Sequence, residues 1–274
     1  MTTSMISAIG RPLDPRYPSN RFVLIAAPLA GLAWMVWKMA TEGDWSEALI
    51  RAAIAAGATF LAWAIARELD PDRPWTAGVA AVGAAAVIGA GPPSLLVSAG
   101  VLLAARIAGR TTGLAPAVID LIPMTLLAIW LGATDPGLAA GVVLGMVLVA
   151  DRWLPGGAVS ASVPFGLLAV AGAVAAAAMW GVLEPAPGLP AGPEWVVAGV
   201  ALVGLTALGR PRSCTSPCDH REDPIDARRV RLGRLVAAGA GALTFVWLAG
   251  PGLTAGSAAW TALAATALPS LRRR

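Results

Sequence analysis

The charged residues of this chain gather in a few short stretches, and long apolar segments separate those stretches. Only 13% of the 274 residues are Asp, Glu, Lys or Arg, whereas an ordinary soluble domain has about 25%. Apolar segments such as 22–39 and 164–183 are long enough to cross a bilayer, which takes about 17–25 helical residues. A helix is the simplest way to satisfy every backbone hydrogen bond within such a segment. The pattern therefore predicts an all-α, polytopic transmembrane helix bundle.

Ten apolar segments, bounded by polar or Pro/Gly breaks, are candidate membrane spans. They are 22–39, 49–66, 76–90, 94–107, 115–133, 138–150, 164–183, 195–208, 235–249 and 253–268. Several have about 13–15 residues and would reach about 20–23 Å at 1.5 Å per residue. A hairpin such as 76–107, 115–150 or 235–268 is also compatible with a re-entrant loop. We expect about ten short Gly/Ala-rich spans, with eight as the alternative.

The positions of Lys and Arg indicate how the chain is oriented. If the N-terminus is inside, all but two of the 20 basic residues lie on the inner side, and the exceptions are Lys38 and Arg51. Because cytoplasmic loops are enriched in Lys and Arg, this asymmetry predicts an N-in/C-in protein of the bacterial cytoplasmic (plasma) membrane. The expected organisation is a cytoplasmic N-terminal segment at 1–21, transmembrane helices within 22–208, a basic cytoplasmic loop at 209–234, a transmembrane hairpin at 235–269 and a cytoplasmic tail at 270–274.

The basic excess also bears on the partners of the protein. The net charge is only +4, and most of the Arg residues lie next to apolar segments. We therefore expect contact with the bilayer and with anionic lipids at the cytoplasmic face, and not with nucleic acid.

Three carboxylates lie within five residues at the inner end of the second apolar segment: Glu68, Asp70 and Asp72. Carboxylate oxygens are ligands that Mg²⁺ prefers, often together with a phosphate, and Arg106 and Arg110 of the next inner loop would supply cations for that phosphate. Short charged loops are also ordinary inner turns of a membrane protein. The cluster is therefore either a solvated turn or part of an enzyme site.

Asp120 is the carboxylate that lies most clearly within an apolar segment, 115–133. An acid inside the membrane is costly and usually faces the bundle interior, where it marks a substrate or ion site. Alternatively, Asp120 pairs with Arg106 or Arg110 and ties two helices together. The sequence leaves both roles open.

Both cysteines and the single histidine lie in the loop 209–234, as Cys214, Cys218 and His220. Zinc takes four nitrogen or sulfur ligands in most structural sites. The spacing Cys-x3-Cys-x-His is a weak match to such a site, so metal binding is the minor hypothesis and a flexible loop the major one. We expect no other cofactor, apart from Mg²⁺ in an enzyme.

Three functional hypotheses follow. The number of spans, their Gly/Pro breaks and a single buried acid favour a small permease or transporter-like bundle, and therefore a protein that is not an enzyme. In its bare layout such a bundle is similar to the drug/metabolite transporters. The first alternative is a membrane-embedded enzyme that acts on a lipid or prenyl phosphate at the cytoplasmic face. The second is a non-catalytic membrane scaffold, in which helices pack through the ridge Gly137, Gly141 and Gly145.

Overall fold

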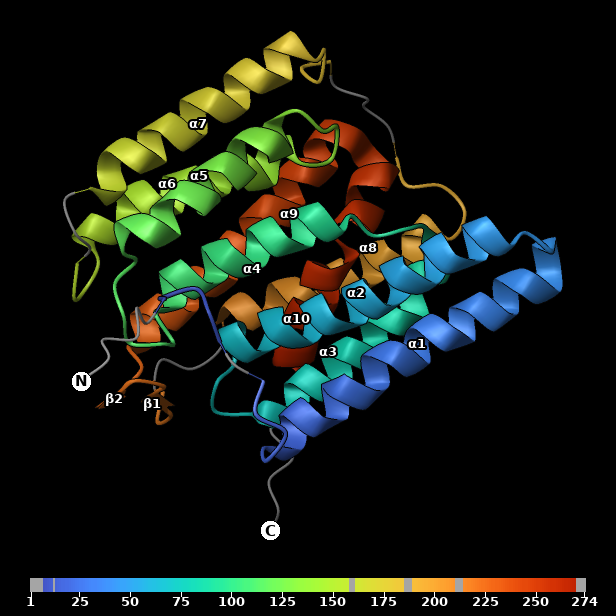
Figure 1. Cartoon of the computed structure of the whole chain (residues 1–274), viewed down its shortest axis with the longest axis horizontal. Coiled ribbons are helices and arrows are strands. Elements are labelled where there is room, and N and C mark those ends of the chain that lie inside the picture. The colour runs from blue at the N-terminus through green and yellow to red at the C-terminus, as the bar shows by residue number, and fades with distance from the viewer. Residues whose placement is uncertain (1–6, 12, 158–160, 185–188, 210–213, 270–274) are drawn as a thin grey trace.

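The computed structural model describes residues 7–11, 13–157, 161–184, 189–209 and 214–269. It shows an all-α bundle, and helices make up 75% of the chain. The α-helices of the described part, labelled in Figure 1, are α1 (Pro18–Glu42), α2 (Trp45–Leu69), α3 (Pro74–Val87), α4 (Leu95–Gly109), α5 (Val118–Gly132), α6 (Leu138–Ala150), α7 (Ser162–Met179), α8 (Glu194–Leu205), α9 (Ala227–Ala255) and α10 (Ser257–Ala267).

Short elements complete the described chain. Three 3-10 helices extend or follow longer helices: η1 (Ile88–Ala90), η2 (Asp151–Trp153) and η3 (Thr206–Gly209). Two short strands, β1 (Pro217–Cys218) and β2 (Arg221–Pro224), form an antiparallel hairpin before α9.

An α-helix lies within or over each of the ten apolar segments expected from the sequence. Four of them, α1, α2, α7 and α9, are long and apolar enough to cross a membrane, which indicates a membrane protein. Shorter apolar helices include α3, α4, α5 and α8. The all-α prediction is confirmed, whereas the number of crossings stays a prediction.

The local sequence explains where several helices begin and end. Asp44 precedes α2, and its side chain accepts hydrogen bonds from the backbone N–H groups of Ser46 and Glu47. Ser94 caps α4 in the same way through the N–H of Val97. Such caps satisfy N–H groups that have no partner within the helix. Gly43 ends α1 in the left-handed conformation, with φ of 71°, that glycine adopts most readily.

α9 departs from the expected boundaries at both ends. It begins at Ala227, inside the segment expected to be a loop, because Asp226 caps it by accepting a hydrogen bond from the N–H of Arg228. The helix breaks at Ala249, whose φ of 51° and ψ of −129° are not helical. This break lies at the last residue of the apolar segment 235–249, just before the segment 253–268. The remaining piece leads into α10, which is buried among α2, α3 and α8 (Figure 1).

Small residues allow close helix packing around α6. A Cβ atom added to Gly141 would lie 2.6 Å from the carbonyl oxygen of Ala128 in α5, and one added to Gly145 would lie 2.9 Å from the nitrogen of Val170 in α7. Two members of the expected glycine ridge therefore lie at helix contacts. Gly137, just before α6, meets the end of α5 and the connecting turn, because a Cβ atom there would clash with the carbonyl oxygen of Leu131.

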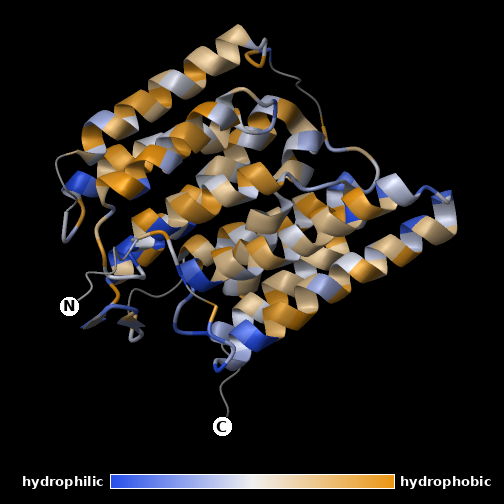
Figure 2. Cartoon of the chain, in the orientation of Figure 1, coloured by the Kyte–Doolittle hydropathy of each residue, from blue (hydrophilic) through white to orange (hydrophobic). Residues whose placement is uncertain are grey.

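Polar segments collect at one end of the bundle, where Figure 2 shows hydrophilic residues at the start of α1 and α9. Hydrogen bonds join distant segments there. Arg73 donates to the carbonyl oxygen of Thr266 over 2.7 Å, and Arg234 donates to that of Leu69 over 2.9 Å. We call this region the charged end. It comprises residues 7–11, 13–21, 67–73, 106–120, 151–157 and 214–234.

Candidate functional site

Glu68 lies at the centre of the charged end, in the last turn of α2. The residue is 1% exposed. Arg106, from the last turn of α4, donates a 2.8 Å hydrogen bond from Nε to Glu68 Oε1, and its Nη2 lies 2.8 Å from the same oxygen in an ion pair. The hydroxyl of Thr111 donates to Oε2, and Arg11 Nη1 lies 3.5 Å from Oε1. Two arginines and a hydroxyl thus compensate a carboxylate that burial would otherwise destabilise.

The segment 7–11 contacts the ends of α2 and α4 and the start of α5. Its backbone carbonyl at Ile9 accepts a hydrogen bond from Arg106, and the carbonyl of Ala8 accepts one from the hydroxyl of Thr112 over 3.3 Å. Arg11 then connects two carboxylates, because its Nη2 lies 2.6 Å from Asp219 Oδ1 while Nη1 faces Glu68. The segment therefore links α2 and α4 to the hairpin β1–β2.

Asp120 fixes the beginning of this segment. Its carboxylate accepts hydrogen bonds from the hydroxyl of Ser7, from the N–H of Ala8 over 3.0 Å and from the N–H of Ala117 over 3.1 Å. Asp120 is therefore a capping residue in the first turn of α5, and it does not pair with Arg106 or Arg110. Those arginines are bound to Glu68 and Asp151 instead. A substrate or ion role for Asp120 remains a prediction.

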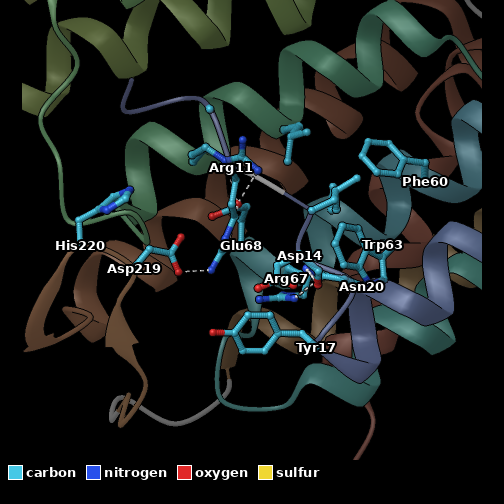
Figure 3. A pocket seen from close by; sticks show the side chains of 15 residues that line it. Arg11, Asp14, Tyr17, Asn20, Phe60, Trp63, Arg67, Glu68, Asp219 and His220 are labelled. Carbon is cyan, nitrogen blue, oxygen red and sulfur yellow. Dashed lines mark hydrogen bonds and ion pairs between the residues drawn. The ribbon is translucent and has the colours of Figure 1, made fainter. Parts of the chain in front are cut away.

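A cavity of about 450 Å³ lies beside Glu68, and Figure 3 shows the side chains around it. Residues of α2, α4, the start of α1, the segment 7–11 and the hairpin contribute to its wall. Those labelled in Figure 3 are Arg11, Asp14, Tyr17, Asn20, Phe60, Trp63, Arg67, Glu68, Asp219 and His220. The wall also includes Leu102 and Arg106 of α4. One side of the cavity is therefore apolar and aromatic, and the other is charged.

Arg67 differs from the other arginines of the cavity. Its guanidinium lies 5.4 Å from the centre of the Trp63 ring and donates a 3.0 Å hydrogen bond to Asn20 Oδ1. Among the residues that the structure describes, no carboxylate lies within 4.0 Å of this guanidinium. Its direct contacts are thus neutral, although the charges of Glu68 and Asp219 also act on it, and a half-buried arginine of this kind is suited to bind an anion.

Asp70 and Asp72 do not join Glu68 in a common site. Asp70 pairs with Arg73 over 2.6 Å, and Asp72 accepts hydrogen bonds from the N–H and hydroxyl of Ser216 over 2.8 and 2.7 Å. The three carboxylates therefore each have a different set of partners. Within the described ranges, no group of three His, Cys, Asp or Glu residues could hold a metal ion. The structure therefore offers no support for an Mg²⁺ site made by these carboxylates.

The cysteine loop is likewise divided between two neighbours. Cys214 donates to Asp72 Oδ1 over 3.3 Å, and the thiol of Cys218 lies 3.9 Å from the carbonyl oxygen of Arg110. His220 lines the cavity instead. The described residues thus do not bring Cys214, Cys218 and His220 together as a zinc site.

The environment of Cys214 changes its acidity. Burial, and then the hydrogen bond to Asp72, raise the pKa of the thiol to about 11. Burial alone would raise the pKa of Asp72, but hydrogen bonds from Ser216, Cys214 and Thr215 hold it below its ordinary value. At neutral pH the pair is therefore a thiol donating to a carboxylate.

A second ion-pair cluster has Asp151 at its centre, with no exposed surface. Arg110 Nη2 lies 2.9 Å from one carboxylate oxygen, and Arg229 Nη1 lies 2.8 Å from the other. Arg229 also donates to the carbonyl oxygen of Pro155 over 2.8 Å. Arg110 is thus part of a contact that joins α4, η2 and α9, and is absent from the residues that line the cavity.

The site candidates from the sequence include Glu68 and Arg106. They do not include Arg11, nor Arg67, which borders the three carboxylates in the sequence but has no role assigned there. One signal was present, because Phe60, Trp63 and Arg67 recur at helical spacing on one face of α2. Nothing in the sequence indicated that residues 7–11 and 13–20 would return to that face.

Comparison with protein-family models, with curated proteins and with solved structures found no match to this chain.

Proposed function

We propose that the protein crosses the bacterial cytoplasmic membrane ten times, with both termini and the charged end in the cytoplasm. The distribution of basic residues supports this orientation, because the opposite end has only Lys38 and Arg51. Each of these pairs with a glutamate four residues away, Lys38 with Glu42 and Arg51 with Glu47. Both basic residues of the opposite end are therefore paired with a glutamate.

We propose further that the cavity beside Glu68 is the site of a permease-like protein that takes its ligand at the cytoplasmic side. The observation that carries this proposal is that the cavity wall comes from five separate segments. A ligand that contacts all of them changes how α1, α2 and α4 pack, and such rearrangement of helices around a site is what transport requires. In this proposal the pair Glu68–Arg106, and not Asp120, provides the charged centre.

The enzyme and scaffold alternatives receive less support. An Mg²⁺-dependent phosphotransfer needs carboxylates that converge, whereas Glu68, Asp70 and Asp72 each bind a different partner. A scaffold needs no cavity lined by a cation such as Arg67.

Arg67→Gln tests this proposal, with Arg21→Gln as its control. Arg67 lines the cavity, whereas Arg21 is an exposed residue of the same end and does not line it. Each variant is scored for its membrane abundance and for its ability to rescue a phenotype of the deletion strain. We expect Arg67→Gln to fail at normal abundance and Arg21→Gln to rescue. Rescue by both variants would refute a functional role for the cavity.

A further inference from the structure

The cavity has a polarity gradient along α2. Phe60, Trp63 and Arg67 lie three and four residues apart, so they follow one another on one face of the helix. Phe60 and Arg67 are about 10 Å apart along the helix axis at 1.5 Å per residue. Along α2 the wall is therefore aromatic toward the middle of the bundle and ends on the cation Arg67 at the charged end, where Asp14, Glu68 and Asp219 also line the cavity.

α4 repeats this gradient on the other side of the cavity. Leu102 and Arg106 are four residues apart and both line the wall. Leu102 lies deeper in the bundle, and Arg106 lies in the last turn of α4 beside Glu68. Two independent helices thus order their side chains from apolar to cationic in the same direction.

The charged side chains at this end of the cavity differ in how far neighbouring groups compensate their charge. The Glu68 carboxylate is bound by Arg106, Thr111 and Arg11, so little of its charge is left to attract a cation. Arg67, in contrast, has a neutral amide and an aromatic ring as its partners. Arg11 adds a guanidinium that is 23% exposed, and its partner Asp219 is 28% exposed. An anion can therefore bind to Arg67 and replace Asp219 at Arg11.

From these observations we infer that the ligand is an amphiphilic anion with a phosphate-type head group and a hydrocarbon chain. The head group binds Arg67 and Arg11 at the charged end, because guanidinium groups match the geometry of phosphate oxygens. The chain lies along Phe60, Trp63 and Leu102, where apolar contact favours it. This inference rests on the proposed function, since it assigns a ligand class to the same cavity.

The test measures binding to the purified full-length protein in nonionic detergent by native mass spectrometry. Dioleoyl phosphatidate is the probe, dioleoylglycerol supplies the chains without the phosphate, and inorganic phosphate supplies the anion without the chains. Arg67→Gln removes the cation, Phe60→Ala shortens the apolar wall, and Arg21→Gln is the matched control. Size-exclusion chromatography checks that each variant remains monodisperse, and Arg11→Gln replaces Arg67→Gln if that variant aggregates.

We expect the protein to bind phosphatidate but not dioleoylglycerol. Arg67→Gln should weaken this binding about tenfold or more, the range for loss of a hydrogen bond to a charged group. Phe60→Ala should weaken it too, and Arg21→Gln should leave it unchanged. Equal weakening by Arg67→Gln and Arg21→Gln would overturn the inference, because binding would then reflect general attraction to basic residues.

Three further outcomes separate the ligand class from the proposed function. Binding of inorganic phosphate that depends on Arg67, without binding of phosphatidate, would show a soluble anion as the ligand and overturn the amphiphile. If phosphatidate does not bind but Arg67→Gln still fails to rescue the deletion strain, the ligand class is wrong and the functional cavity stands. If phosphatidate does not bind and Arg67→Gln rescues, both proposals fail.

Discussion

Arg106 donates from Nε to Glu68 Oε1 and also brings Nη2 within 2.8 Å of that oxygen, although the two residues are 38 positions apart in the chain. Both side chains lie where α2 and α4 end. The pair therefore fixes the ends of these two helices against each other and sets the position of the cavity wall. Its effect on stability follows from its burial.

Glu68→Gln should lower the free energy of unfolding by about 3–5 kcal/mol, because it leaves the buried guanidinium of Arg106 without a full counter-charge. Glu68→Gln combined with Arg106→Met should be more stable than Glu68→Gln alone, since it removes the unpaired charge. Thermal unfolding of the purified protein in detergent measures both. The account of this pair is wrong if the double variant is the less stable of the two.

Asp120→Ala should release the segment 7–11 and weaken the start of α5. The variant loses the acceptor of the Ser7, Ala8 and Ala117 hydrogen bonds, and loss of a helix cap typically costs about 1 kcal/mol. Hydrogen–deuterium exchange should show faster exchange at the Ala8 amide, while the amides in the middle of α5 keep their rates. Unchanged exchange at Ala8 would contradict the anchoring role of Asp120.

The Cys214 thiol should react slowly with iodoacetamide at pH 8, because a pKa of about 11 leaves about one thiol in a thousand ionised at that pH. The rate should rise about tenfold for each pH unit up to about pH 10. Asp72→Asn lowers the pKa by removing the negative charge that opposes ionisation, so the rate at pH 8 should increase.

These rates are measured in a Cys218→Ser background, so that Cys214 is the only thiol that reacts with iodoacetamide. The same chain with Asp135→Asn is the control, since Asp135 lies in the turn between α5 and α6 and away from the thiol. A rate that reaches its plateau near pH 9 would show that Asp72 and burial do not suppress ionisation of Cys214.

Gly145→Ala and Gly239→Ala should change stability in opposite directions. A Cβ atom at Gly145 meets backbone and side-chain atoms of Val170 at 2.9 Å or less, and overpacking of this kind typically costs about 1–3 kcal/mol. A Cβ atom at Gly239 meets no atom within 4 Å, so the gain in helix propensity of up to about 1 kcal/mol should be retained. Thermal unfolding of both variants checks this, and equal shifts would contradict the close contact of α6 with α7.

The helices could be predicted from the sequence because lipid and a packed interior favour the same apolar residues. The segments 22–39 and 49–66 are long apolar runs, and each is contained in a helix of 25 residues. The boundaries of α9 were harder to predict. Its first turns are rich in arginine, and these arginines lie in a helix because Asp226 caps it and Asp151 binds Arg229.

The site was only partly predictable, for a different reason. Glu68 and Arg106 were identified as charged residues at the inner ends of two spans, a pattern visible in the sequence. Their pairing depends on how α2 and α4 pack, and the return of Arg11 depends on anchors at Asp120 and Arg106. A sequence pattern carries no information about contacts between segments that lie so far apart.

We predict that the charged end, with its cavity, faces the cytoplasm. Cysteine labelling tests it most directly in a chain that carries Cys214→Ser and Cys218→Ser. Tyr17→Cys places a thiol at the cavity, where the residue is 63% exposed, and Asp135→Cys places one at the opposite end.

A membrane-impermeant maleimide is applied to intact cells and to inside-out membrane vesicles, with the cysteine-free chain as the control. We predict that Asp135→Cys is labelled in intact cells, and that Tyr17→Cys is labelled only in inside-out vesicles. Labelling of Tyr17→Cys in intact cells would contradict the account, because the charged end and its cavity would then face the outside.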